Sequence, residues 1–155
     1  MSIGGKNLFK QLTLLVSMLA SCQVLAQRYA PNHIDLRASY CVAFHKNTIS
    51  VYSYVIADEM NSVRLYGAEF VEQIRASIAS SENNLSRLSS YMLPRIKFLD
   101  AEALILAANQ FTKDFNFLKL CSGKCTSIDC ASACSTSTGY TEKVNWCTDL
   151  NWIPF

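Results

Sequence analysis

Four cysteines lie within fourteen residues, in the segment CSGKCTSIDCASAC (residues 121–134). Thiolates this close together can bind a metal ion, whereas thiols in an oxidising compartment form disulfides. Structural zinc sites usually pair their cysteines as C-x2-C across a long gap, in a reducing compartment. Here the cysteines form two C-x3-C steps. The spacing therefore favours disulfides, and we predict neither a metal site nor a cofactor.

The N-terminal residues 1–26 have the pattern of an export signal. Lys6 and Lys10 precede the nine-residue apolar run LTLLVSMLA, and the small residue Ala26 ends the following SCQVLA. Such a run is too short to span a bilayer, which needs ~20 residues. We expect cleavage after Ala26, which leaves one secreted or periplasmic domain over residues 27–155, of 155 − 26 = 129 residues.

A second cleavage site is an alternative. The segment LASC (residues 19–22) resembles the lipobox of bacterial lipoproteins. Cleavage before Cys22 would lipidate that cysteine and make the chain an outer-envelope lipoprotein. Either cut leaves the same six cysteines: Cys41, Cys121, Cys125, Cys130, Cys134 and Cys147. An even number in a small exported chain indicates a disulfide framework.

Six cysteines allow fifteen wirings, and the sequence alone cannot select one. If each C-x3-C step lies on one face of a helical turn, the two turns fold back so that Cys121 pairs with Cys134 and Cys125 with Cys130. Cys41 then bridges to Cys147. The main alternative links Cys41 to Cys121 and joins Cys147 to Cys130 or Cys134. Both wirings tie the first predicted helix to the C-terminal region.

Three segments carry apolar residues at intervals of three and four, the period of an amphipathic helix. The first covers residues 39–60. Its β-branched content also favours a strand, but twenty-two residues without Gly or Pro exceed an ordinary strand. The second covers residues 63–92, and the third follows Asp100, a suitable N-cap. We expect three helices, preceded by an irregular lead-in over residues 27–38.

Three amphipathic helices need one another to bury their apolar stripes. We therefore predict an all-α protein, a small up-and-down bundle of three main helices with a disulfide-stapled, cysteine-rich C-terminal segment. Most aromatic side chains of the helices are assigned to its core: Tyr40, Phe44, Tyr52, Tyr54, Tyr66, Phe70, Phe111, Phe115 and Phe117.

The balance of charge argues against a nucleic-acid partner. The chain has 14 basic and 12 acidic residues, and removal of Lys6 and Lys10 leaves 12 of each. A balanced chain without a basic run is not typical of nucleic-acid-binding proteins. No stretch after the N-terminal run is long and apolar enough for a transmembrane helix.

Catalytic signatures are scarce, and we predict that the protein is not an enzyme. Neither His33 nor His45 lies in a recognised motif, and paired cysteines leave no free nucleophilic thiol. The neighbouring carboxylates of Asp58 and Glu59 are expected to close a helix, and those of Asp100 and Glu102 to begin one. The triplet Asn84-Leu85-Ser86 is a glycosylation sequon, relevant in a eukaryotic secretory pathway.

The leading functional hypothesis is a small exported scaffold that binds another protein. Rigid, cross-linked scaffolds lose little entropy on binding. The C-terminal NWIPF segment either docks on the bundle or contributes to a binding patch of Trp146, Trp152, Ile153 and Phe155. An enzyme with an unrecognised site would instead need a cleft in which His45 approaches a carboxylate.

Two families share part of this pattern. Plant α-hairpinin peptides are similar in their twinned C-x3-C motifs, with longer connecting loops. Insect odorant-binding proteins are similar in being secreted, helical and six-cysteine, which implies the alternative function of a carrier for small apolar ligands. The 79 residues between Cys41 and Cys121 depart from that family's spacing. A buried cavity above about 300 Å³ would favour the carrier, and a solid core the protein binder.

Overall fold

The computed structural model describes residues 29–137 and 139–154. Six α-helices and one 3-10 turn occur in this part of the chain: α2 (His33–Val55), α3 (Glu59–Tyr66), α4 (Ala68–Met92), η1 (Ile96–Phe98), α5 (Ala101–Ser122), α6 (Ile128–Ser137) and α7 (Tyr140–Thr148). The expected signal over residues 1–26, the lipidation site Cys22 and the terminal Phe155 lie outside the described residues. Cleavage, lipid attachment and the domain boundary therefore stay predictions.

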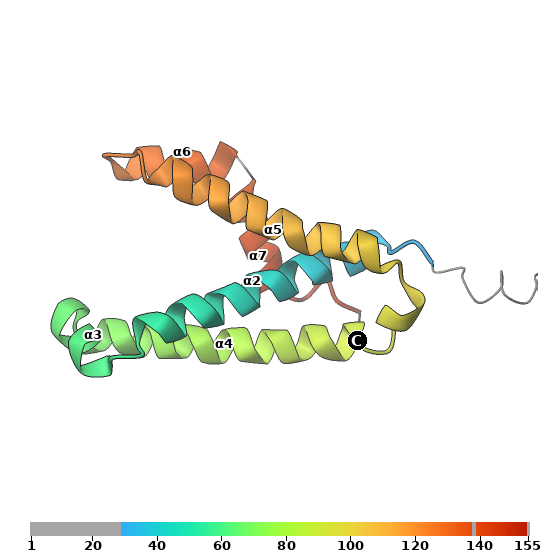
Figure 1. The fold of residues 1–155 in the computed structure, drawn as a ribbon, viewed down its shortest axis with the longest axis horizontal. Helices are drawn as coiled ribbons and strands as arrows, with labels where there is room; N and C mark the ends of the chain where they lie inside the picture. Colours follow the sequence, from blue (N-terminus) through green and yellow to red (C-terminus); the bar gives the residue numbers. More distant parts are fainter. Residues whose placement is uncertain (1–28, 138, 155) are drawn as a thin grey trace, which may run out of the picture.

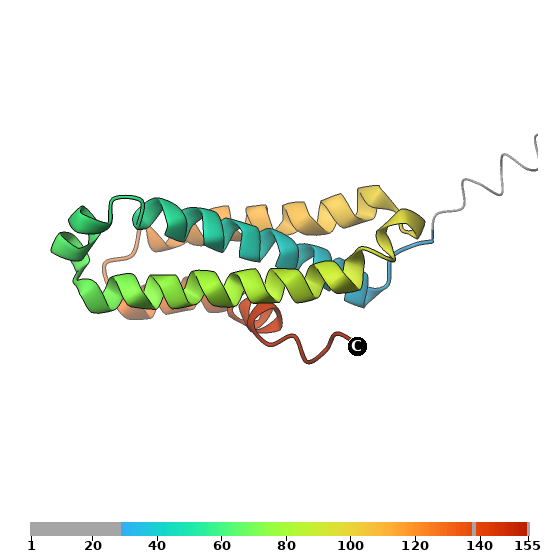
Figure 2. The same cartoon turned by 90° about the horizontal axis from the view of Figure 1, so that it is seen from below.

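The three longest helices form an up-and-down bundle. Helix α4 runs antiparallel to α2, and α5 runs back in the direction of α2 (Figure 1). Both α4 and α5 pack along α2, which is therefore the central helix. Helix α6 lies beside α5, and α7 crosses the bundle where it contacts α2, α4 and α5 (Figures 1 and 2). The predicted all-α bundle with a stapled C-terminal segment is confirmed.

The core lies where α2 meets α4, α5, α7 and the residues after α7. Its buried members are Ala38, Tyr40, Cys41, Leu88, Met92, Leu99, Leu104, Phe111, Cys147, Leu150 and Ile153. Tyr40 and Phe44 meet Phe111 edge to face, with ring centroids 5.6 and 6.0 Å apart, an arrangement that aromatic quadrupoles favour. Among the described residues, no helix is long and apolar enough to cross a membrane.

Helix α2 begins earlier than predicted, at His33 in place of residue 39. The side chain of Asn32 accepts a hydrogen bond from the backbone N–H of Asp35 (2.9 Å), and Asp35 accepts one from the backbone N–H of Asn32 (3.0 Å). This reciprocal capping box satisfies two N–H groups that have no partner within the helix. The irregular lead-in predicted for residues 27–38 was therefore wrong from residue 33 onwards.

Two helices replace the single one predicted for residues 63–92. Gly67 has φ 89° and ψ 157°, a conformation that only glycine adopts readily, and it separates α3 from α4. Asp58 begins α3 because its side chain accepts a hydrogen bond from the N–H of Asn61 (3.1 Å). The prediction that Asp58 and Glu59 close the first helix was therefore wrong. That helix ends at Val55.

The N-cap of α5 is confirmed. The side chain of Asp100 accepts a hydrogen bond from the backbone N–H of Glu102 at 3.0 Å. The assignment of the aromatic side chains to the core was wrong for four of them. Tyr54, Tyr66, Phe70 and Phe117 are 84%, 57%, 40% and 51% exposed. They lie at the end of α2, in α3, at the start of α4 and near the end of α5, away from the core cluster.

Candidate functional site

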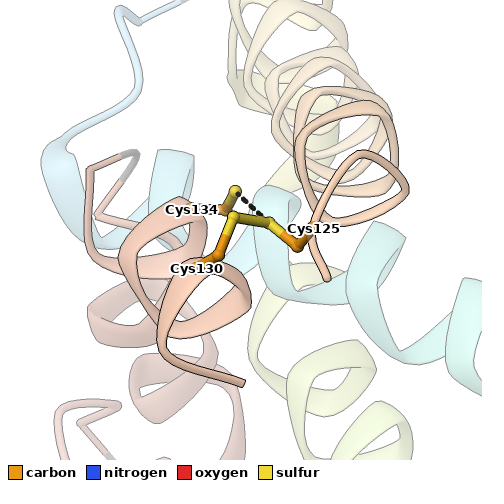
Figure 3. A group of neighbouring side chains, drawn as sticks. All are labelled: Cys125, Cys130 and Cys134. Atoms are coloured by element: carbon orange, nitrogen blue, oxygen red, sulfur yellow. Dashed lines mark hydrogen bonds between the residues drawn. A yellow bond between two sulfur atoms is a disulfide. The ribbon is translucent and has the colours of Figure 1, made fainter. Parts of the chain in front are cut away.

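The cysteine-rich segment forms a compact hairpin of two adjoining disulfides. Cys121 at the end of α5 is bonded to Cys134 in α6, and Cys125 is bonded to Cys130. The Sγ atoms of Cys125 and Cys134, which belong to different bridges, lie 3.7 Å apart (Figure 3). The structure thus has the first of the two wirings. However, α5 ends at Ser122, so Cys125 lies in the connecting loop and not on a helical turn.

A serine caps the start of α6. The backbone N–H of Cys130 donates to the hydroxyl of Ser127 at 3.3 Å. Cys130 and Cys134 are four residues apart in α6, so they lie one turn apart on the same face of the helix. The hairpin therefore depends on a loop with a serine cap.

The sulfurs of Cys125, Cys130 and Cys134 lie within 4.8 Å of one another (Figure 3). Metal ligation needs thiolates, and all three sulfurs are bonded in disulfides. The hairpin could hold a metal ion only after both bridges were reduced. In its oxidised form it is a covalent staple between α5 and α6.

The third disulfide joins distant parts of the chain. Cys41 in α2 and Cys147 in α7 are both fully buried, and their Cα atoms lie 5.0 Å apart across a sequence separation of 106 residues. Both sulfurs belong to the hydrophobic core. This bridge fixes α7 on the central helix.

Side chains from three other segments cap the C-terminal end of α7. The last four carbonyls of an α-helix have no partner within the helix. His45 Nε2 lies 2.8 Å from the Cys147 carbonyl oxygen, and Asn84 Nδ2 lies 3.4 and 3.5 Å from the carbonyl oxygens of Cys147 and Thr148. The indole N–H of Trp152 donates to the carbonyl of Trp146 at 2.7 Å. The structure thus gives His45 and Asn84 a positioning role at this helix end.

This geometry bears on both histidines. His45 is 2% exposed, and burial holds the pKa of its imidazole below the usual value, although the bond to the Cys147 carbonyl partly offsets this. His45 therefore meets a backbone carbonyl and not the carboxylate that an enzyme site would need. His33 is exposed on the first turn of α2. Asn84 is 8% exposed, so in the folded protein its sequon is closed to glycosylation.

The two carboxylate pairs noted in the sequence, Asp58 with Glu59 and Asp100 with Glu102, have local structural roles. Asp58 and Asp100 cap helices. Glu59 forms an exposed ion pair with Arg75 (2.5 Å), and Glu102 is an exposed residue of the first turn of α5. Their local roles account for these positions.

Two other carboxylates, which sequence reasoning missed, are buried. Asp35 is 1% exposed and accepts hydrogen bonds from Arg95 Nε (2.9 Å), Arg95 Nη2 (3.2 Å) and the hydroxyl of Tyr91 (2.8 Å). Burial alone would raise the pKa of Asp35, but the hydrogen bonds from Arg95, Tyr91 and Asn32 and the charge of Arg95 lower it. Burial and the same contact raise the pKa of Tyr91 to about 12. This cluster joins the start of α2 to the end of α4.

Asp114 is the second buried carboxylate, and it joins α5 to α2 and α7. It accepts hydrogen bonds from Lys143 Nζ (2.6 Å), the amide of Gln110 (2.7 Å) and the hydroxyl of Tyr40 (3.1 Å). Burial, and then the nearby charge of Asp114, raises the pKa of Tyr40. One signal for this residue was present in the sequence, because Asp114 lies three residues after Phe111 on the apolar stripe of α5.

The proposed tail patch lies against the bundle. Ile153 is 4% exposed and belongs to the core, while Trp146 and Trp152 are half-buried. The guanidinium of Arg37 lies 4.4 Å from the ring centroid of Trp146 and 5.2 Å from that of Trp152, which is cation–π distance. The described part of the NWIPF segment is therefore docked.

An open cleft of about 590 Å³ lies between α2, α4 and α7, with Phe115 of α5 at its wall. His45 and Asn84 line it where they meet the end of α7. Its size falls within the range of small-molecule sites, but it is open to solvent and is not the enclosed cavity that the carrier hypothesis described.

Comparison with known proteins gives no further guide: no family model, no curated protein and no solved structure matches the chain.

Proposed function

We propose that this protein is an exported, non-catalytic scaffold that binds another protein through one end of its bundle. The structure is that of a small helical protein with three disulfides. Disulfides of this kind form in an oxidising compartment. The signal-like residues 1–26 support export. The observation that carries the proposal is a group of large, exposed apolar side chains at one end of the bundle.

This group of side chains, called the apolar tip, lies at the end of the bundle formed by the end of α2, by α3 and by the start of α4 (Figure 1). It consists of Tyr54, Met60, Leu65, Tyr66 and Phe70, which are 84%, 84%, 60%, 57% and 40% exposed. The rings of Tyr66 and Phe70 are 5.1 Å apart. Exposed apolar patches on a protein surface mark binding surfaces, and Tyr is enriched among residues that dominate binding energy.

Helix α3 itself supports this reading. It has eight residues, and Ser62 is its buried residue. Isolated helices this short are marginal in water, so α3 relies on its caps, on the ion pair of Glu59 with Arg75 and on packing against α4. A helix with so little buried surface contributes little to the core. Its apolar residues are better explained by a partner.

Rigidity supports binding over catalysis. Three disulfides and two buried carboxylate clusters fix the bundle behind the tip. The histidine and carboxylates that could have served catalysis have structural partners among the described residues. A preorganised surface of this kind binds with a small entropy cost.

Site-specific photo-crosslinking tests the proposal. A benzophenone amino acid at position 66 should give an adduct with a second protein in the native extracellular or periplasmic milieu. The same group at Asn109, an exposed position of α5 outside the tip, is the matched control and should give none. The adduct should disappear when Met60→Ser and Leu65→Ser are added. Equal adducts at both positions, or none at position 66, would contradict the proposal.

The mature N-terminus is a separate question with a direct answer. Mass spectrometry of the protein from its source should find Gln27 at the N-terminus if the signal is cleaved after Ala26. A diacylated Cys22 would instead support the envelope lipoprotein. An intact residue 1 would argue against export.

A second candidate function is favoured by the cleft beside α7. A cleft of about 590 Å³ with aromatic walls supports the carriage of a small, mostly apolar ligand. The tip and the cleft are separate surfaces, so the two functions are compatible.

A further inference from the structure

The cleft combines apolar walls with an uncharged lining. Its apolar surface comes chiefly from Phe44, Val51, Phe115 and Val144, and its polar groups are amides, hydroxyls and one imidazole. None of its lining residues is Asp, Glu, Lys or Arg. An ionised group buried without a counter-charge is strongly disfavoured. The lining therefore disfavours a charged group in the part of the ligand that the cleft buries.

His45 lines the cleft, and its ring carries the buried side-chain nitrogen that has no hydrogen-bond partner in the described part of the chain. Its Nε2 lies 2.8 Å from the Cys147 carbonyl oxygen, and a carbonyl oxygen only accepts, so Nε2 carries the proton. Burial disfavours the charged ring. Nδ1 of the neutral ring is therefore an acceptor, and among the described residues it is the buried side-chain nitrogen or oxygen without a hydrogen-bond partner.

Several contacts fix the position of the His45 ring. The Cys147 carbonyl, which Asn84 also contacts, accepts the hydrogen bond from Nε2. The Cys41–Cys147 disulfide lies one turn before His45 in α2. The ring of Phe44 meets the His45 ring edge to face at 5.0 Å. A buried acceptor left without a donor costs free energy. A ligand that donates to it recovers this free energy.

From these observations we infer that the cleft binds an uncharged amphipathic molecule whose hydroxyl donates a hydrogen bond to Nδ1 of His45, with its apolar part against Phe44, Val51 and Phe115. The ligand class is that of apolar alcohols and phenols. The inference rests on the second candidate function, ligand carriage, and names its chemistry. Because Nδ1 exposes less than 1 Å², the hydroxyl must enter between the imidazole and its neighbours.

The test uses four probes with the same ten-carbon chain: 1-decanol, its methyl ether, decanoate and decylammonium. Each is titrated into the full oxidised protein, in competition with an environment-sensitive fluorescent dye. The alcohol should bind about fivefold more tightly than the ether, the ratio expected of one hydrogen bond. The two charged probes should bind more weakly than the alcohol.

Variants locate the site. Ser80→Phe fills the cleft from α4 without touching His45, and it should abolish binding. Ser90→Phe, at an equally exposed serine of α4 that does not line the cleft, is the control and should bind as the unaltered protein does. His45→Leu should remove the preference for the alcohol over the ether.

His45→Leu also loses the bond to Cys147, and it could fail to fold. A second measurement therefore uses the unaltered protein. In imidazole ¹⁵N spectra, the Nδ1 signal of His45 should move on addition of decanol in the direction of a nitrogen that accepts a hydrogen bond. It should stay in place on addition of the ether.

The outcomes distinguish failure of the head-group assignment from failure of ligand carriage. Equal binding of alcohol and ether, blocked by Ser80→Phe, would overturn the head-group assignment and leave ligand carriage intact. Tighter binding of a charged probe would also overturn it. Absence of binding by all four probes would overturn both.

Discussion

Removal of the Cys41–Cys147 disulfide should cost far more stability than removal of the Cys125–Cys130 disulfide. The first bridge joins residues 106 apart and the second joins residues 5 apart. A bridge limits the entropy of the unfolded chain by an amount that grows with the logarithm of the loop length. On that relation the long bridge contributes about 4.8 kcal/mol at 25 °C and the short one about 2 kcal/mol.

The two double variants are Cys41→Ala with Cys147→Ala, and Cys125→Ala with Cys130→Ala. Urea unfolding followed by far-UV circular dichroism gives the free energy of unfolding of each. The long-bridge variant should lose at least 2.5 kcal/mol more than the short-bridge variant, since it also loses two fully buried sulfurs. Small domains are stable by about 5–15 kcal/mol, so this variant should approach the limit of folding. Equal losses would refute the reasoning.

The structure predicts the outcomes of three further substitutions. The pKa of Asp35 is lower in the folded state, so its contribution to stability is present above about pH 4 and is lost below it; Asp35→Asn should flatten acid unfolding curves in that range. The pKa of His45 is also lower when folded, so stability should fall as the pH drops below about 6.5, and His45→Gln, which keeps a donor for Cys147, should reduce that slope. Gly67→Ala places a side chain at φ 89° with nothing within 4 Å, so backbone strain alone should lower the free energy of unfolding in urea by about 1–3 kcal/mol.

The fold class followed from the sequence because three long stripes at helical spacing allow few other arrangements. The third helix was the most accurately placed, since Asp100 is a strong N-cap and nothing within 101–122 interrupts the helix. The errors in helix boundaries arose at short local signals that start or divide a helix. Asn32 with Asp35 forms a capping box, and Gly67 permits a conformation that divides two helices. Both signals are local and were present in the sequence.

The site was less accessible to sequence reasoning, because its contacts are long-range. His45 and Asn84 meet at the carbonyl of Cys147, 102 and 63 residues away. No periodicity indicates that two polar side chains will cap the end of a third helix. Asp35 and Asp114 are similar, since each is buried by partners from other helices. A charged residue on an apolar stripe is the signal that could have identified Asp114.

The exposed aromatic residues show the opposite failure. Tyr66 and Phe70 continue the helical stripe of the second segment, so periodicity alone assigns them to the core. At this end of the bundle α5 diverges from α2 and α4 (Figure 1), and both side chains stay exposed. Helical spacing therefore identified which residues share a face and left open whether anything covers that face.

The placement of Leu150 and Ile153 in the core determines when the chain can become native. During synthesis or transport from the N-terminal end, α2, α4 and α5 emerge first, yet the surface of α2 around Ala38 and Cys41 stays uncovered until residues 147–153 arrive. Until then Cys41 is a free thiol without its native partner, so formation of the Cys41–Cys147 disulfide must await the last helix. A protein assembled in this order stays incompletely packed until the end of its chain is present.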